Sequence, residues 1–138
     1  MDKNWTGHRH RLRVYFDDTD AGGVAYHANY LKWAERARTE SLRAMDLPHS
    51  LMMERYSAML VVRRIEVEYV APARLDDALD VATRVRAVGA ATLDLEQHVL
   101  RGEAVLAKLL VGLVCVRADG LRPTRLPAPW RAALEGLV

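Results

Sequence analysis

The chain has 138 residues, 51% of them apolar, and a formal net charge of +2 with its histidines neutral. This length and composition suit one hydrophobic core, so we expect residues 1–138 to form a single domain. The charge is too mildly basic to indicate a nucleic-acid-binding surface. No apolar stretch approaches the ~20 residues of a membrane span, and the polar N-terminus lacks a signal-peptide core. These features predict a cytoplasmic protein.

The first predicted element is a strand over residues 8–16. Its two sides differ in character: His10, Leu12, Val14 and Phe16 fall on one, and Arg9, Arg11 and Arg13 on the other. This alternation is typical of a half-buried strand. The loop DDTDAGGVAYHA follows, and its adjacent glycines at positions 22 and 23 break regular structure.

A long helix is predicted next, over residues 28–48, because the segment is rich in helix formers and contains no Gly or Pro before Pro48. Asn29 stands at its start, where an asparagine is a good N-cap. One face at helical spacing carries Tyr30, Ala34, Ala37, Ser41 and Met45. The middle of this face is small, which predicts that the helix packs closely against a sheet.

Four further strands are predicted over residues 58–70, 78–88, 92–101 and 104–117. In the first of them, Val62, Arg64, Glu66 and Glu68 alternate with Val61, Ile65, Val67 and Tyr69. Short connections between these strands indicate an antiparallel meander. The lone cysteine, Cys115, cannot form an internal disulfide, and its apolar strand predicts a buried thiol.

The end of the chain is predicted to hold a turn with a short edge segment over residues 117–127, followed by a short helix over residues 128–138. One strand, a loop, one long helix and then several strands predict an α+β fold. In such a fold the helix must bury its apolar face on a single curved sheet.

The loop at residues 17–28 lies directly before the helix N-terminus, where backbone N–H groups lack intrahelical partners and attract negative charge. Gly22 and Gly23 allow a ligand to approach the backbone without a Cβ clash. A carboxylate beside such donors suits hydrolysis: the donors stabilise an oxyanion, and the carboxylate activates water or attacks a carbonyl.

Simpler interpretations stand beside this one. Asp17, Asp18 and Asp20 are also typical turn formers, and His27 is a typical capping or surface histidine. The loop does not match a calcium-binding pattern, so no metal site is expected. Glu35 either approaches the active-site end or forms a helix-surface pair with Arg36 or Arg38, and the surface pair is favoured.

The segment VYFDDTDAGGVAYHANYLKWAERARTESLR resembles the signature of hotdog-fold acyl-CoA thioesterases, relatives of hydroxybenzoyl-CoA thioesterase. The matching positions are Asp18, Asp20, Gly23, Val24, Tyr26, His27 and Tyr30. ERARTE at residues 35–40 is typical of the Tol–Pal-associated branch, and VVRRIEVEYVAPARLDD and RPTRLP are also similar to it. The resemblance implies one long central helix wrapped by a curved antiparallel sheet of five to six strands. It also implies a homodimer or homotetramer with sites at subunit boundaries.

The resemblance implies that Asp20 is the catalytic base or nucleophile, with both roles open, and that the backbone N–H of His27 polarises the thioester carbonyl. The His27 side chain is also implicated, and a histidine there argues against a hydroxybenzoyl substrate. Substrate contacts are expected from Gly23, Val24, Tyr26 and Tyr30, and CoA phosphate contacts from Arg63 or Arg64. No cofactor or metal is expected. The alternatives are hydrolysis of acyl carrier protein thioesters and a non-catalytic acyl-binding or envelope-associated scaffold.

Overall fold

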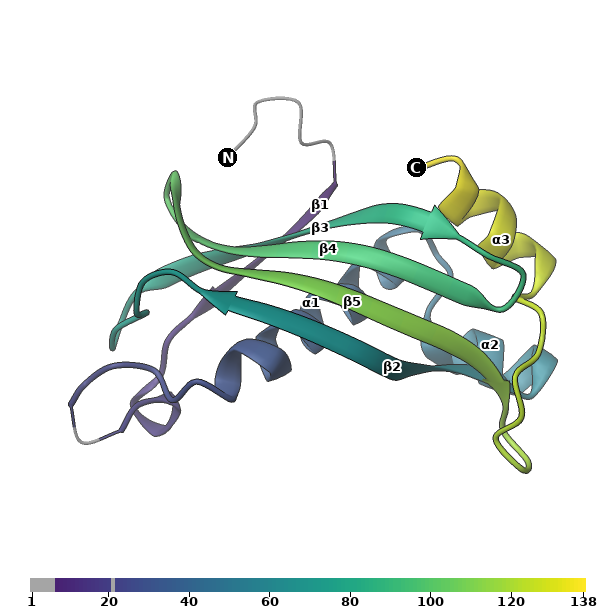
Figure 1. The fold of residues 1–138 in the computed structure, drawn as a ribbon, viewed down its shortest axis with the longest axis horizontal. Helices are drawn as coiled ribbons and strands as arrows, with labels where there is room; N and C mark the ends of the chain where they lie inside the picture. Colours follow the sequence, from purple (N-terminus) through teal and green to yellow (C-terminus); the bar gives the residue numbers. More distant parts are fainter. Residues whose placement is uncertain (1–6, 21) are drawn as a thin grey trace.

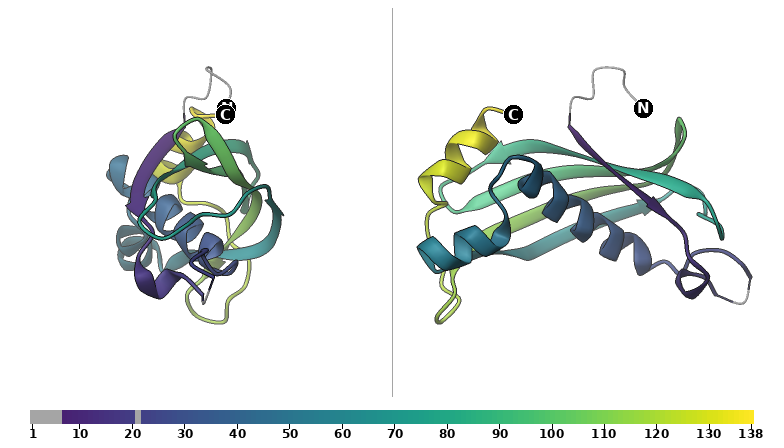
Figure 2. Two further views of the ribbon diagram at one scale, coloured as in Figure 1. Left: turned by 90° about the vertical axis from the view of Figure 1, so that its left-hand side faces the viewer. Right: turned by 180° about the vertical axis from the view of Figure 1, so that it is seen from behind.

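A computed structural model describes residues 7–20 and 22–138. Its elements in chain order are β1 (His8–Arg13), the 3-10 turn η1 (Phe16–Asp18), α1 (Asn29–Ala44), α2 (His49–Tyr56), β2 (Ala58–Tyr69), β3 (Ala78–Val88), β4 (Thr92–Arg101), β5 (Ala104–Arg117) and α3 (Ala128–Glu135). The strands form one antiparallel sheet in the order β1-β3-β4-β5-β2, and this sheet curves around α1 (Figure 1, Figure 2). The predicted α+β hotdog fold is confirmed.

The core lies between α1 and the concave face of the sheet. The buried side chains of α1 are Tyr30, Trp33, Ala34, Ala37, Arg38 and Leu42. Ala34 and Ala37 are fully buried, as the small-residue face predicted, and their size lets the helix axis approach the strands. Ser41 and Met45, towards the C-terminal end of this face, are only partly buried. Cys115 is a buried free thiol, as predicted.

The bounds of β3, β4 and β5 coincide with the predicted strands. The first strand is shorter than predicted and ends at Arg13. Beyond it, Val14 donates its N–H to the Asp77 carbonyl at 2.9 Å, and the chain turns into η1. Phe16, predicted to lie in this strand on the same side as Leu12 and Val14, is outside it and exposed.

The predicted continuous meander is wrong for β2. Strands β3, β4 and β5 follow one another, but β2 pairs with β5 rather than with β3. Residues 70–77 therefore cross the end of the sheet, a distance of about three strand spacings or 14 Å, which eight extended residues easily span. The N–H groups of Val70 and Ala71 donate to the Leu106 carbonyl, which holds this crossing segment against β5.

The predicted faces of β2 are also partly wrong. The register with β5 shifts between Val62 and Arg64, so Arg63 forms a β-bulge. As a result, Leu60 and Val62 lie opposite Cys115 and Leu113 and share the inner face with Ile65 and Val67. Val61 does not lie on that face. The inward-facing residues of β2 have even numbers before the bulge and odd numbers after it. Counting alternate residues in the sequence cannot predict this change.

The helices depart from prediction in two places. Asn29 is not the N-cap of α1: that position is Ala28, and the Asn29 amide instead donates to the Asp18 carbonyl at 2.7 Å. The short helix α2 was not predicted. The last helix, α3, was predicted, and Trp130 on it donates Nε1–H to the Leu47 carbonyl at 2.9 Å. Within the described residues, no helix is long and apolar enough to cross a membrane.

Candidate active site

The predicted catalytic loop folds as a small hairpin at one end of the sheet (Figure 1). Thr19 and Ala25 form an isolated antiparallel bridge. Inside it, Asp20 donates its N–H to the Val24 carbonyl at 3.1 Å, and Gly23 donates to the Asp20 carbonyl at 3.0 Å. Gly23 has φ +75°, a conformation that suits glycine and strains other residues. Asp20 thus lies in the tip of a hydrogen-bonded turn.

Asp18 forms hydrogen bonds with the loop and with the start of α1. Its carboxylate Oδ2 accepts the Tyr15 N–H at 2.8 Å, and its carbonyl accepts the Tyr26 N–H at 2.9 Å. The same carbonyl accepts the Asn29 amide at 2.7 Å. These bonds tie the hairpin to the first turn of α1, so Asp18 has a structural role.

Asp20 has a different environment. Its side chain is exposed, and Oδ1 accepts the Gly22 N–H at 2.9 Å, which is an Asx turn. Among residues 7–20 and 22–138 no cation pairs with this carboxylate, and Oδ2 has no hydrogen-bond donor. The simpler turn-former interpretation is therefore correct for one oxygen, while the second oxygen is available to a water molecule or substrate.

His27 lies where the chain enters α1. Its carbonyl accepts the Tyr69 hydroxyl at 3.0 Å, and its ring packs against Tyr26 and, edge-on, against Tyr69. Its own backbone N–H has no acceptor in the described part of the chain. Ala28, the N-cap, has no side chain that could cover the end of the helix. An uncapped helix start with a free N–H is an anion-attracting site.

The crossing segment supports the loop from behind. Ala25 donates its N–H to the Ala73 carbonyl at 2.8 Å, and Val24 forms a bridge with Arg74. Ala73 in turn donates its N–H to the Tyr30 hydroxyl at 2.8 Å, and Tyr30 is only 3% exposed. Tyr30 therefore joins helix, crossing segment and loop, which places it in the supporting wall rather than on the surface.

An ion pair fixes the far end of the crossing segment. Asp77 Oδ2 accepts the Arg74 N–H and the Arg101 guanidinium, each at 2.8 Å. Burial opposes ionisation of Asp77, but these two donors outweigh it and lower the pKa of the carboxyl group.

The remaining predicted site residues fall into two groups. Tyr26 is 52% exposed beside His27, and Val24 and Gly23 are half-buried in the hairpin. Arg63 and Arg64 are exposed on β2, and Arg64 pairs with Glu66. They lie five or six residues from Tyr69 along the same strand, which is roughly 17–20 Å from Tyr69 at strand geometry. One chain does not bring these arginines to the loop.

Two further residues differ from expectation. Glu35 forms no ion pair with any residue that the structure describes, so the favoured surface pair is absent. Tyr69, which contacts His27, was not singled out as a site residue, because nothing in its local sequence indicates a partner 42 positions away. No group of three or more metal-ligating side chains occurs within the described ranges.

Comparison with known proteins assigns the family. The sequence profile of the Thioesterase-like superfamily matches residues 14–134. The chain belongs to this superfamily. It is 40% identical over 126 residues to "Acyl-CoA thioesterase YbgC" of Haemophilus influenzae, covering 91% of this chain and 93% of that protein. It is 44% identical over 128 residues to "Acyl-CoA thioester hydrolase YbgC" of Escherichia coli O6:H1, covering 90% and 92%.

Solved structures agree with this assignment. A probable thioesterase from Bartonella henselae superposes with a TM-score of 0.84 at 34% identity, covering 88% of this chain and 100% of that one. A hypothetical protein from Aquifex aeolicus superposes with a TM-score of 0.86 at 27% identity, covering 92% and 98%. The family resemblance carried by the loop motif is confirmed, and the names of the curated relatives fit the branch that it indicated.

Proposed function

We propose that this chain hydrolyses acyl-CoA thioesters to a free carboxylic acid and CoA. The observation that carries the proposal is that one loop contains a carboxylate with a free oxygen and, at a helix start, an N–H without an acceptor, both judged among residues 7–20 and 22–138. Two YbgC proteins named for this activity are 40% and 44% identical to the chain over nine-tenths of its length.

In the proposed reaction the His27 N–H donates to the thioester carbonyl oxygen and stabilises the charge that develops there. Asp20 either takes a proton from the attacking water or attacks the carbonyl carbon itself. The C–S bond then breaks, and the CoA thiolate leaves and is protonated. On the route in which Asp20 attacks, water then hydrolyses the resulting anhydride, which releases the carboxylic acid and restores the Asp20 carboxylate. Both routes need an ionised, accessible Asp20, and its exposed position supports this requirement.

Tyr69 is a positioning residue in this scheme. Its hydroxyl holds the His27 carbonyl, which limits rotation of the peptide that follows His27. Tyr30 is also a positioning residue. Its hydroxyl accepts the Ala73 N–H, and the Ala73 carbonyl accepts the N–H of Ala25 in the loop. Preorganised donors need no rearrangement at the moment of reaction, which is where their catalytic value lies.

The active form is proposed to be a homodimer, or a tetramer built from it, with a cytoplasmic location. Strand β2 is twelve residues long and forms an edge of the sheet, and its inward-facing Val62 is 47% exposed. A long edge strand with apolar exposure favours association. A partner subunit would also supply a route by which Arg63 or Arg64 reaches CoA phosphates.

The test is release of CoA thiol from acyl-CoA substrates of increasing chain length by wild type, Asp20→Asn and Asp17→Asn. Asp17 is an exposed neighbour with no side-chain bond among the described residues, so it is the matched control. We expect Asp20→Asn to lose roughly 10²–10⁴-fold or more in kcat and Asp17→Asn to stay near wild type. Equal rates in all three proteins would refute the assignment of Asp20.

The same assay separates the alternatives. A larger kcat/KM with acyl carrier protein thioesters than with the matching acyl-CoA would favour the carrier-protein reaction. Absence of turnover with either class, in a folded protein, would favour the non-catalytic scaffold.

A further inference from the structure

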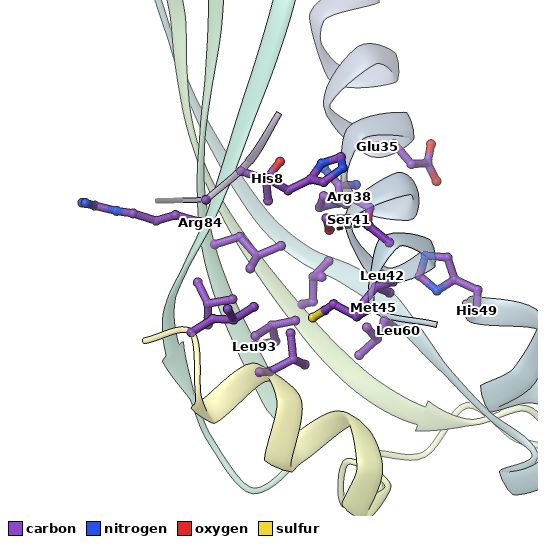
Figure 3. A pocket seen from close by; sticks show the side chains of 18 of the residues that line it. His8, Glu35, Arg38, Ser41, Leu42, Met45, His49, Leu60, Arg84 and Leu93 are labelled. Carbon is purple, nitrogen blue, oxygen red and sulfur yellow. Dashed lines mark hydrogen bonds between the residues drawn. The ribbon is translucent and has the colours of Figure 1, made fainter. Parts of the chain in front are cut away.

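A cavity of about 450 Å³ lies between the C-terminal half of α1 and the concave face of the sheet (Figure 3). This volume is within the range of small-molecule sites. The walls are mainly aliphatic, with Leu42, Leu60, Val85, Leu93, Leu95 and Leu113 among the lining residues. None of the lining residues belongs to the loop at residues 17–30. The catalytic proposal therefore leaves this cavity without a function.

Arg38 lines the cavity from α1 and is only 6% exposed. Its Nη1 donates to Gln97 Oε1 at 3.1 Å, and no other acceptor and no carboxylate in ion-pair contact occurs within the described residues. Burial lowers the pKa of the Arg38 guanidinium, and the more distant Glu35 offsets this only in part. A buried cation without a counter-ion is expensive.

Gln97 cannot neutralise this charge. It is a neutral amide, and its Nε2 already donates to the Ala34 carbonyl and to Thr83 Oγ1, both at 2.9 Å. These bonds hold the Gln97 oxygen towards Arg38 and thereby fix the guanidinium in place. Since a guanidinium has five N–H donors, most of those on Arg38 remain available to a ligand.

A second polar group faces the same cavity from β1. Nδ1 of His8 is buried and has no hydrogen-bond partner among the residues described. Figure 3 shows the His8 ring directed towards α1 beside Arg38. Glu35 and His49 lie at the outer side of the cavity on α1 and α2, and the exposed Glu35 is screened by solvent. Arg38, with donors not used by Gln97, and His8, with its unpartnered Nδ1, are thus near each other at one side of an apolar space.

We propose that this cavity binds an apolar carboxylate, with its carboxylate group at Arg38 and His8 and its hydrocarbon body along the leucine-rich wall. The planar guanidinium matches a carboxylate in geometry and charge. A neutral ester or thioester of the same acid would leave Arg38 without a counter-ion, so the site distinguishes the free acid from its esters. The free acid formed by thioester hydrolysis and a fatty acid from elsewhere share this chemistry.

The experiment is calorimetric titration of the full chain with decanoate and, separately, with decanol, which has the same hydrocarbon length but no charge. The variants are Arg38→Met and the matched control Arg36→Met, an exposed arginine on the same helix. We expect wild type to bind decanoate at least tenfold more tightly than decanol. Arg38→Met should remove that preference by weakening decanoate binding alone, and Arg36→Met should change neither affinity.

Two additional variants keep the outcome interpretable. His8→Phe retains ring volume and should weaken decanoate binding several-fold without changing decanol binding, which provides a test if Arg38→Met does not fold. Asp20→Asn should bind decanoate like wild type, because the cavity and the loop share no residue. Equal affinity of wild type for decanoate and decanol, or no decanoate binding at millimolar concentration, would overturn the proposal. A loss of decanoate binding in Asp20→Asn would instead assign the ligand to the catalytic loop. Because the readout is binding, none of these results depends on turnover.

Discussion

The hydroxyl group of Tyr30 is predicted to contribute measurably to the free energy of unfolding. Tyr30→Phe removes the acceptor of the Ala73 N–H, and Ala73 is itself fully buried. An unsatisfied buried donor destabilises by about 1–3 kcal/mol. For a chain of this size that corresponds to a fall in Tm of roughly 3–5 °C for each kcal/mol.

The assay is urea unfolding at one fixed protein concentration, since association contributes to the stability of an oligomer. Tyr26→Phe is the matched control: Tyr26 precedes α1 by three residues, is half exposed, and its hydroxyl bonds to nothing in the described structure. We expect the control to stay within about 0.5 kcal/mol of wild type. If Tyr30→Phe were equally neutral, the Ala73 N–H would have another acceptor in solution, and the coupling of α1 to the crossing segment would be wrong.

Three other predictions follow from the site. His27→Ala should lower kcat/KM by ~10²-fold if the imidazole assists the backbone donor, whereas a loss below about threefold in the thiol-release assay would leave the backbone role alone. Because the pKa of Asp77 is lowered in the folded state, its contribution to stability is present above the unfolded value near 3.9 and is lost as the pH falls through the folded value. Urea midpoints between pH 7 and pH 3 should therefore fall less steeply in Asp77→Asn than in wild type. Sedimentation at micromolar concentration should show a species heavier than 15.5 kDa, and a purely monomeric profile would contradict the dimer.

The parts of the fold that the sequence predicted are those governed by local periodicity. Strands β3, β4 and β5 are separated by short turns, and their bounds coincide with prediction. The position of β2 beside β5 depends on how the sheet closes around the helix, and the bulge at Arg63 depends on that pairing. Neither leaves a local signal. The short helix α2 was also missed.

The candidate site also combines residues that the local sequence indicated with residues that it did not. The residues proposed to carry the chemistry lie in one contiguous loop, and the resemblance indicated them from the loop motif. The residues that hold the loop in place come from elsewhere: Tyr69 from the end of β2, and Ala73 and Arg74 from the crossing segment. Since their contacts bridge some 40 to 50 positions of sequence, only the folded chain brings them to the loop.

Arg38 is an exception, because the sequence did indicate that this residue is buried. It lies four residues after Ala34 and next to Ala37, so helical spacing assigns it to the buried face. It was instead assigned, with Arg36 as the alternative, as a surface partner of Glu35. The structure follows the spacing and buries Arg38 with Gln97 as its only hydrogen-bond acceptor among the described residues. When helical periodicity places a charged side chain on the buried face without an opposite charge beside it, the question is which counter-ion neutralises it. At Arg38 the free acid is the counter-ion that the apolar cavity is shaped to admit, which is why the titration with decanoate addresses this residue first.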